Sequence, residues 1–362
     1  MHNYKSLQQL ARAAGAALLG LCALSALLPL SAQAQDSAPV NGTGASFPSL
    51  VYQSWAQQYE KQFGIPVNYK PTGSGDGVKK IVARAVDFGA SDTPLSDADL
   101  ERHHLIQLPM LVGGIVPVYR LPGINAELKL TGELLADMFR GQVKSWNDAR
   151  IAALNPGVAL PALPIKRVVR ADKSGSTDAL SRYLAQVSEA FKAEVGAGQL
   201  PKWPAGAIAA EGNDGMVKAL SETPGGLAYV SYDRVRLHKL SAVQLPSGSG
   251  SYVSASEQAF RAAISASRIV QADDDRASLI NLPTPTAWPI TTTSFVLLDT
   301  QPSSAQRGES GLRFVYWAFQ SGDRLLRNSG FAPLPAQLQA KLVARFRQVR
   351  PQDGRALNYA TL

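Results

Sequence analysis

The chain has 362 residues, of which 45% are hydrophobic and 18% are charged, and its formal net charge is +8. This hydrophobic share allows a folded core, and 30 glycines and 23 prolines are too few for a low-complexity or collagen-like chain. A single cysteine excludes a disulfide framework and a Cys-rich zinc module, and four histidines leave little for a histidine-rich metal site. At about 150 residues per domain, the length predicts roughly two domains.

Residues 1–34 have the pattern of a cleaved signal peptide. Lys5 and Arg12 form a positive start, residues 13–30 form an uncharged run rich in Ala and Leu, and Ala32-Gln33-Ala34 is a small-x-small cleavage motif. A transmembrane anchor is the alternative, because about 18 apolar residues can just span a bilayer. The alanine content of the run and the cleavage motif that follows it favour a signal peptide, and the sequence therefore predicts export.

Cleavage after Ala34 decides what remains of the chain. Cys22 lies in the apolar run, but the bulky Leu21 before it disfavours a lipoprotein signal, which prefers a small residue there. The mature chain has 328 residues and no cysteine, and the loss of two cations lowers its net charge from +8 to +6. Its stability must come from core burial alone. The diffuse positive charge fits an anionic ligand, and no Lys/Arg cluster indicates a nucleic-acid partner.

Helix and strand patterns alternate along the first half of the mature chain. Val51, Trp55, Tyr59 and Phe63 recur at four-residue spacing, which predicts a helix over 49–63. An apolar run over 110–119, interrupted by Gly113-Gly114, predicts a strand through the interior. Between them we predict a strand over 67–69, a helix over 77–86 and a strand over 86–90.

The alternation continues in the second half. A strand that ends at 168–169 is followed by a polar loop and then by apolar residues at helical spacing: Leu180, Tyr183, Leu184, Val187 and Phe191. Residues 226–231 and 294–298 read as strands, and residues 312–319 as a late helix. This order predicts the α/β class with largely parallel sheets. Residues 155–165 and 246–251 are predicted to be loops.

Four short polar loops hold the candidate ligand residues: 42–48, 72–77, 89–94 and 170–177. For each loop alone, helix capping is the simpler interpretation, because Ser and Gly favour helix starts. Together they combine three helix entries rich in Ser and Gly with one arginine, Arg170, and one aspartate, Asp92. Ligands in α/β proteins collect at such strand–helix junctions, and helix N-termini favour anions. The loops therefore predict a pocket for a small tetrahedral oxyanion.

The residue types in these loops suit phosphate. Backbone N–H groups and hydroxyls donate many hydrogen bonds without adding net charge, and one guanidinium adds a bidentate, charge-assisted pair. Near neutral pH phosphate keeps a P–OH proton that needs an acceptor, whereas sulfate has no proton. An ionised Asp92 would accept that proton and would repel sulfate. Sites built around such a bond discriminate by about 10⁴–10⁵.

Five separated motifs together resemble one family. They are the segments 42–48 (Gly-Thr-Gly-Ala-Ser-Phe-Pro), 86–92 (Val-Asp-Phe-Gly-Ala-Ser-Asp), 170–176 (Arg-Ala-Asp-Lys-Ser-Gly-Ser), 212–215 (Gly-Asn-Asp-Gly) and 287–291 (Ala-Trp-Pro-Ile-Thr). In this order they resemble the periplasmic phosphate-binding proteins of phosphate-specific ABC transporters, the PstS family. The resemblance runs from about residue 38 to the C-terminus. It implies a two-lobed periplasmic binding protein of the type II topology, with the ligand in the interdomain cleft.

The resemblance also implies the domains and partners. The first lobe would be discontinuous, formed by residues 35–111 and 289–362, and the second lobe would be formed by 112–288. The protein would reside in the periplasm, bind inorganic phosphate as a monomer, and deliver it to an inner-membrane ABC permease of two subunits with its ATPases. It would not be an enzyme and would need no cofactor, metal or nucleic acid.

The family's ligand positions map onto eight residues of this chain. They are Ser46 (hydroxyl and N–H), Phe47 (N–H), Ser74 (hydroxyl), Asp92 (proton acceptor), Arg170 (bidentate donor), Ser174 (hydroxyl), Gly175 (N–H) and Ser176 (N–H and hydroxyl). Asp172 matches the acid that holds the arginine in place. The motifs at Asn213 and Trp288 are expected to shape and hinge the domains.

Asp76 departs from the family pattern, and two alternative functions have to be considered. Asp76 adds a negative charge close to the expected anion site, and we interpret it as a cap of the following helix. A binding protein for another oxyanion (sulfate, molybdate or a phosphonate) is one alternative, which Asp92 disfavours where the anion has no proton. A secreted hydrolase is the other, but the sequence has no Gly-x-Ser-x-Gly motif, and His103, His104 and His238 lie in no catalytic motif.

Overall fold

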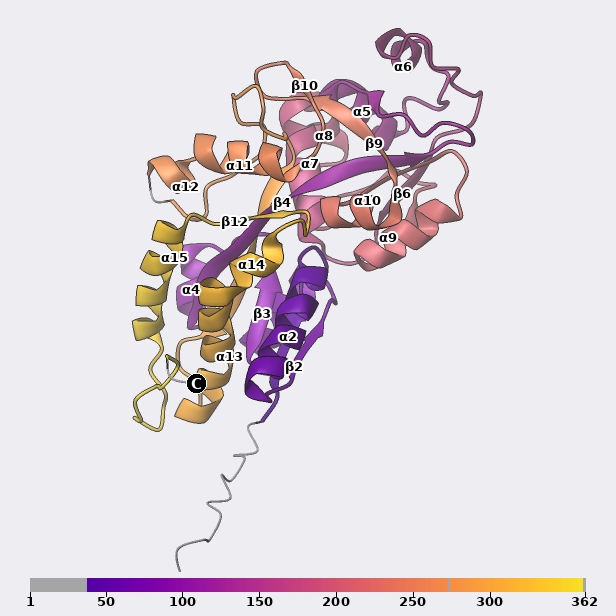
Figure 1. Ribbon diagram of the computed structural model, residues 1–362. Helices are drawn as coiled ribbons and strands as arrows, with labels where there is room; N and C mark the ends of the chain where they lie inside the picture. The colour runs from indigo at the N-terminus through magenta and orange to yellow at the C-terminus, as the bar shows by residue number, and fades with distance from the viewer. Residues whose placement is uncertain (1–37, 273, 361–362) are drawn as a thin grey trace, which may run out of the picture. The chain divides into compact units, whose positions relative to one another are not determined.

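The structure is a computed structural model that describes residues 38–272 and 274–360, so the predicted signal peptide lies outside the described residues. Strands and helices alternate along this part of the chain (Figure 1). The strands are β1 (Val40–Gly44), β2 (Val67–Lys70), β3 (Phe88–Ser91), β4 (Leu105–Arg120), β5 (Leu128–Lys129), β6 (Lys166–Arg170), β7 (Ile208–Ala210), β8 (Gly226–Ser231), β9 (Ser241–Pro246), β10 (Tyr252–Val253), β11 (Thr291–Asp299) and β12 (Phe331–Pro333).

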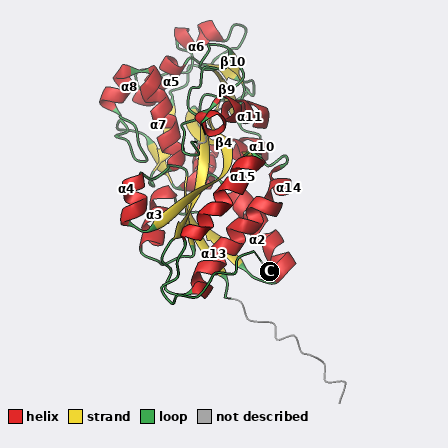
Figure 2. Cartoon of the chain, turned by 90° about the vertical axis from the view of Figure 1, so that its left-hand side faces the viewer, coloured by secondary structure: helices red, strands yellow, loops and turns green. Residues whose placement is uncertain are grey.

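The helices lie on both sides of these strands (Figure 2). They are α2 (Ser49–Phe63), α3 (Ser74–Val82), α4 (Asp97–Arg102), α5 (Gly132–Arg140), α6 (Ala149–Leu154), α7 (Gly175–Val187), α8 (Glu189–Glu194), α9 (Gly212–Ser221), α10 (Tyr232–His238), α11 (Glu257–Ala266), α12 (Arg268–Gln271), α13 (Ala305–Trp317), α14 (Asp323–Leu326) and α15 (Ala336–Val343). A π-helical turn (Ala318–Gly322) precedes α14, and a 3₁₀ turn (Ala344–Gln348) follows α15. Within the described ranges, no helix has the length and apolarity to cross a bilayer.

The strands join in the order β2-β1-β3-β11-β4-β8-β6-β7. The outer pairs are parallel: β1 with β2 and β3, and β6 with β7 and β8. In the centre, β11 runs antiparallel to β3 and β4, and β4 runs antiparallel to β8. The α/β class is confirmed, but the prediction of largely parallel sheets is wrong in the centre, because β4 and β11 run against their neighbours.

Strand β4 is shared by two groups of strands. Its first ten residues pair with β11 and β12, and its last six pair with β8 and β9. Every residue of β4 except Arg120 is buried, which is why the sequence shows a continuous apolar run rather than alternation. The strand begins five residues before the predicted segment, at Leu105.

Helix α2 shows why the N- and C-terminal parts of the described chain lie together. Val51, Trp55 and Tyr59 form its buried stripe, and the helix ends at Gly64, which has the left-handed conformation that favours glycine. Trp55 Nε1 donates to the carbonyl oxygen of Gly322 at 3.1 Å. In Figure 1 the indigo α2 accordingly lies beside the gold α13 and α14. The predicted helix over 49–63 is confirmed.

Several other element boundaries differ from the predictions. The strand over 226–231 is confirmed as β8, and those near 67, 88, 168 and 294 are confirmed with shifted ends. The helix predicted over 77–86 is α3, which begins at Ser74 and ends at Val82. The helix predicted through Phe191 is two helices, because Ser188 ends α7 and caps α8 with a 3.1 Å bond from the Phe191 N–H to its Oγ.

Candidate functional site

The predicted ligand residues come together where strands end and helices begin. Ser46 follows β1, Ser74 begins α3, Asp92 follows β3, Arg170 ends β6, and residues 174–176 begin α7. We call the eight residues the cradle: Ser46, Phe47, Ser74, Asp92, Arg170, Ser174, Gly175 and Ser176. The six polar or charged side chains of the cradle are all buried. The Ser74 Oγ joins the loops, because it accepts 3.2 Å hydrogen bonds from the N–H groups of Asp92 and Gly175.

Asp92 is a buried carboxylate held by β11. Its Oδ1 accepts a 2.7 Å hydrogen bond from the Ser294 hydroxyl, and its Oδ2 lies 3.5 Å from the Ser74 Oγ. Burial raises the pKa of Asp92 to about 7, although Ser294, Arg170 and Ser74 oppose this shift. The carboxylate therefore changes its protonation near neutral pH and can accept a proton from a ligand when it is ionised.

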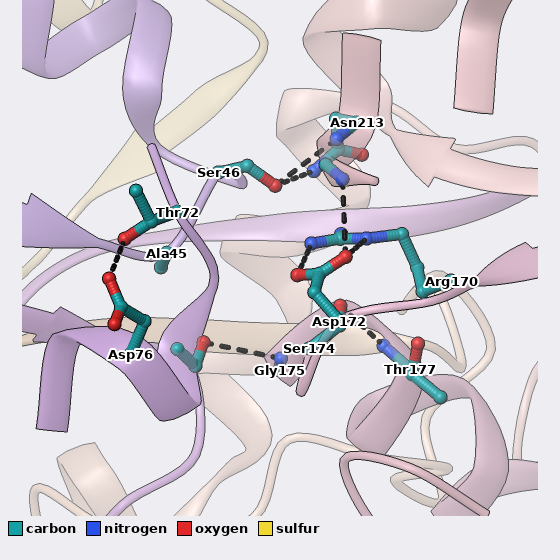
Figure 3. Close-up of polar contacts among 12 residues, drawn as sticks. Ala45, Ser46, Thr72, Asp76, Arg170, Asp172, Ser174, Gly175, Thr177 and Asn213 are labelled. Carbon is teal, nitrogen blue, oxygen red and sulfur yellow. Dashed lines mark hydrogen bonds and ion pairs between the residues drawn. The ribbon is translucent and has the colours of Figure 1, made fainter. Parts of the chain in front are cut away.

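Arg170 is a buried cation fixed by Asp172. The Arg170 Nε donates to Asp172 Oδ1 at 2.7 Å, and Nη2 is bonded to Oδ2 of the same carboxylate (Figure 3). Asp172 also accepts from the Gly212 N–H at 3.2 Å. Burial alone would raise the pKa of Asp172, but the bonds and charge of Arg170 outweigh it and lower that pKa below its usual range. The contact predicted for Asp172 is present, and it leaves the Arg170 Nη1 unused by this carboxylate.

The start of α7 contributes three cradle residues. The Ser174 Oγ accepts from the Thr177 N–H at 3.2 Å (Figure 3), so it caps the helix while its own hydroxyl proton stays available to a ligand. The Ser176 Oγ is buried and has no hydrogen-bond partner among the described residues. A Cβ on Gly175 would lie 2.4 Å from the Asp92 Cβ, so only glycine allows this approach. A small hydrogen-bond acceptor would satisfy the orphaned Ser176 hydroxyl.

The first loop contacts the far side of the cradle through Asn213. The Ser46 Oγ accepts from both the N–H and the Nδ2 of Asn213, each at 3.1 Å (Figure 3). The Phe47 ring packs in the core, 5.0 Å between centroids from Phe331, so its backbone rather than its side chain is left for a ligand. Pro48 directly precedes the first residue of α2, and its carbonyl oxygen accepts from the Tyr52 N–H at 3.0 Å.

Asp76 supports the second loop. Its Oδ2 accepts from the Thr72 Oγ1 at 2.5 Å (Figure 3). The same oxygen pairs with the Lys80 Nζ at 2.9 Å. Burial would raise the pKa of Asp76, but these two partners outweigh it and lower that pKa. The capping interpretation is wrong in detail, because the N-cap of α3 is Gly73 and no side chain caps it. Asp76 instead ties the loop to the first turn of the helix.

Sequence reasoning missed two residues that shape the site, Ser294 and Tyr229, and gave a third, Asn213, a different role. Ser294 holds Asp92 from 202 positions away, Asn213 bonds Ser46 directly, and the Tyr229 hydroxyl accepts from the Arg170 N–H at 3.1 Å. A signal existed for Ser294, because the four polar residues 291–294 directly precede the apolar residues 295–298 and are buried with them in the same strand. Within residues 38–272 and 274–360, no group of three His, Cys, Asp or Glu side chains is placed to hold a metal ion.

Comparisons with known proteins show which family this chain resembles. Residues 30–321 match the sequence model of a PBP superfamily domain. The Phosphate-binding protein PstS of Pasteurella multocida is 38% identical over 339 residues, which cover 93% of this chain and 97% of that protein. The protein of the same name from Haemophilus influenzae is 37% identical over 309 residues, which cover 85% of this chain and 92% of that protein.

Solved structures are similar in fold. A phosphate-binding protein from Stenotrophomonas maltophilia has a TM-score of 0.64 at 20% identity, with 85% of this chain and 94% of that chain covered. A high affinity periplasmic phosphate-binding protein solved with bound phosphate has a TM-score of 0.66 at 20% identity, with 84% and 93% covered. The predicted periplasmic-binding-protein fold is confirmed by these matches.

Proposed function

We propose that this chain, which belongs to the PBP superfamily and, within it, to the phosphate-binding proteins named PstS, captures one inorganic phosphate ion in the cradle and delivers it to an ABC importer. The observation that carries the proposal is the buried grouping of a fixed cation, Arg170, an unpartnered hydroxyl, Ser176, and a carboxylate with a raised pKa, Asp92. Such a set offers charge, donors and a single acceptor to one small anion.

Each cradle residue would meet a different part of the phosphate. Arg170 would supply charge-assisted N–H bonds, with Asp172 holding the guanidinium in place. The hydroxyls of Ser46, Ser74, Ser174 and Ser176 would donate to phosphate oxygens. The N–H group of Phe47, just before α2, would add a donor where the helix dipole favours an anion. The Gly175 N–H at the start of α7 donates to the Ser74 Oγ in this structure, and it would share its proton between that oxygen and the phosphate.

Asp92 would make the site selective. It would accept the P–OH proton of phosphate, whereas a fully ionised sulfate would present lone pairs to the carboxylate at close range. Because the carboxylate is buried, the unpaired contact would cost far more than it would in water. This argument favours phosphate over sulfate and molybdate, and phosphonate, which can carry a proton, is the remaining candidate among oxyanions.

We further propose that the cradle lies between two lobes, 35–111 with 289–362 and 112–288. The division of β4 supports this, because its pairing partners change after Gly114. Polar contacts would then join the lobes at the cradle itself, from Asn213 to Ser46 and from the Gly175 N–H to Ser74. A ligand bound by residues of both lobes would stabilise their closure.

Location and partners follow from the same proposal. The predicted signal peptide and the periplasmic relative support a periplasmic protein. We propose that it acts as a monomer with two permease subunits and their ATPases. A binding role rather than catalysis is supported by the names of the relatives, and none of the histidines weighed for the hydrolase alternative is among the cradle residues.

Titration calorimetry on phosphate-stripped protein tests the proposal. We expect one phosphate per chain with a Kd of about 1 μM or below, which corresponds to about −8 kcal/mol or better. Sulfate at the same concentration should give no binding heat. Absence of heat with phosphate would overturn the proposed function, and equal heats for the two anions would overturn the role of Asp92.

A further inference from the structure

Asp178 is a buried carboxylate that the cradle does not use. It lies in the first turn of α7, two residues after Ser176, and is only 4% exposed. Its Oδ2 accepts from the Thr93 Oγ1 at 3.1 Å and from the Arg182 Nε at 2.8 Å, but its Oδ1 is buried without a hydrogen-bond partner among the described residues. An acid in a first turn ordinarily stabilises the helix from the surface, and burial with half its acceptors unmet is costly.

One cavity is lined both by this carboxylate and by Asp92 of the cradle. Its volume is about 220 Å³, and both Asp178 and Asp92 line it, together with Thr93, Arg182 and Thr293. Thr293 also has a buried hydroxyl without a partner in the described part of the chain. The charge of Asp178 acts on Asp92: burial is the main cause that raises the pKa of Asp92, and the negative charge of Asp178 adds to that rise.

The surrounding charges do not cancel that of Asp178. Its only cationic partner in the structure's described residues, Arg182, has a side chain that is 54% exposed, so water screens that cation strongly. The buried cation of the cradle, Arg170, is already paired with Asp172. A second arginine that lines the cavity, Arg276, is paired with Asp97. The carboxylates of Asp92 and Asp178 therefore lie beside the cradle without a buried cation of their own, and an anion bound there must overcome their repulsion.

We propose that Asp178 is an affinity-limiting residue, whose buried charge opposes the bound phosphate so that the site releases it faster than the cradle alone would. The inference rests on the proposed function, because it concerns the affinity of that site for phosphate. It acts at a distance, through the cavity and through Asp92, rather than by contact with the ligand. Differences in affinity at one site appear mostly in the dissociation rate, which is the step that matters for delivery to a transporter.

The substitution Asp178→Asn tests the proposal because it removes the charge and keeps the shape. We expect phosphate to bind roughly tenfold tighter, equivalent to about 1.4 kcal/mol, with most of the change in the dissociation rate measured by stopped-flow. Arg182→Gln removes the partner cation and should weaken binding about two- to fivefold, the effect of an exposed charge. The control Glu189→Gln makes the same charge change on a side chain that is 85% exposed, and it should leave the Kd unchanged.

The outcomes separate this inference from its alternatives. Unchanged or weaker phosphate binding in Asp178→Asn would overturn the role of Asp178 in limiting affinity. If both Asp178→Asn and Thr93→Val bound phosphate more weakly, Asp178 would instead serve to fasten the Thr93 loop to α7. If Asp178→Asn fails to fold, as judged by circular dichroism, Arg182→Gln decides, and unchanged or tighter binding there overturns the inference. Wild-type protein without phosphate binding would instead overturn the proposed function itself.

Discussion

Asp92→Asn changes one buried carboxylate oxygen into an amide nitrogen and removes one negative charge from the cradle. The amide oxygen can keep the 2.7 Å bond from Ser294, and the new NH₂ group takes the place of Oδ2, which lies 3.5 Å from the Ser74 Oγ. The substitution therefore keeps the local packing and alters only what a ligand meets. A P–OH group loses its acceptor, and a proton-free oxygen gains a donor.

The expected size of the effect follows from these two changes. A hydrogen bond to a charged acceptor contributes about 1.5–3 kcal/mol, so its loss weakens phosphate binding by roughly 10- to 150-fold. Removal of a buried negative charge beside the anion offsets part of this for phosphate. For sulfate both changes are favourable, since repulsion ends and a donor appears. We therefore expect a phosphate preference of about 10⁴ or more to fall by at least about 100-fold.

Calorimetric titrations with phosphate and sulfate measure this ratio for the wild type and for Asp92→Asn. The matched control is Asp76→Asn, the same substitution at an acid whose side chain pairs with Thr72 and Lys80. The control should keep the wild-type preference. The reasoning would be refuted if Asp92→Asn also kept it, or if both variants lost it equally.

Three further substitutions and one pH dependence follow from the same contacts. Arg170→Ala should weaken phosphate binding by several kcal/mol, because it leaves the Asp172 carboxylate uncompensated in the site; a calorimetric Kd equal to that of the wild type would place the site elsewhere. Asp172→Asn should weaken binding by about tenfold through loss of the bond that orients the guanidinium, and a larger loss than in Arg170→Ala would contradict a positioning role. Asn213→Ala should weaken phosphate binding by about 1–2 kcal/mol, because it removes the bond from Nδ2 to the Ser46 Oγ and the 2.9 Å bond that Oδ1 accepts from the Ser231 N–H, while the backbone N–H of residue 213 keeps its bond to Ser46; an unchanged Kd would show that these side-chain bonds do not support the bound state. In ligand-free protein, the pKa of Asp92 is raised from 3.8 to about 7, so the folded state binds more protons than the unfolded chain between these values. The contribution of Asp92 to the free energy of unfolding is therefore fully present below about pH 4, and up to roughly 4 kcal/mol of it is lost as the pH rises to about 7. Asp92→Asn should remove this pH-dependent loss, as measured by urea unfolding. Parallel pH profiles of the free energy of unfolding for the two proteins would contradict this expectation.

Local chemistry explains which parts of the site the sequence could predict. Ser and Gly at helix starts leave a local pattern, and the strand–helix alternation places those starts at strand ends, so the loops at Ser46, Ser74 and Ser174 stand out. The helix over 49–63 is equally clear, because its aromatic stripe has a period that no strand shares. The family resemblance then supplied the individual roles of the cradle residues, which remain predictions.

Long-range pairing explains what the sequence could not predict. Ser294 reaches Asp92 only because β11 runs antiparallel beside β3, with Phe295 opposite Ser91, and no local pattern encodes that register. Asn213 meets Ser46 across 167 positions for the same kind of reason. The break at Ser188 was hidden because the apolar spacing of α7 continues into α8 at Phe191.

A crystal structure of the protein with bound phosphate would show whether the cradle holds the anion. We expect a buried phosphate that contacts the Arg170 guanidinium and the Ser176 hydroxyl, with one of its oxygens about 2.5–2.7 Å from Asp92, the length of an O–H···O⁻ bond. A phosphate bound outside these loops, or an Asp92 side chain rotated into solvent while the anion is present, would contradict it.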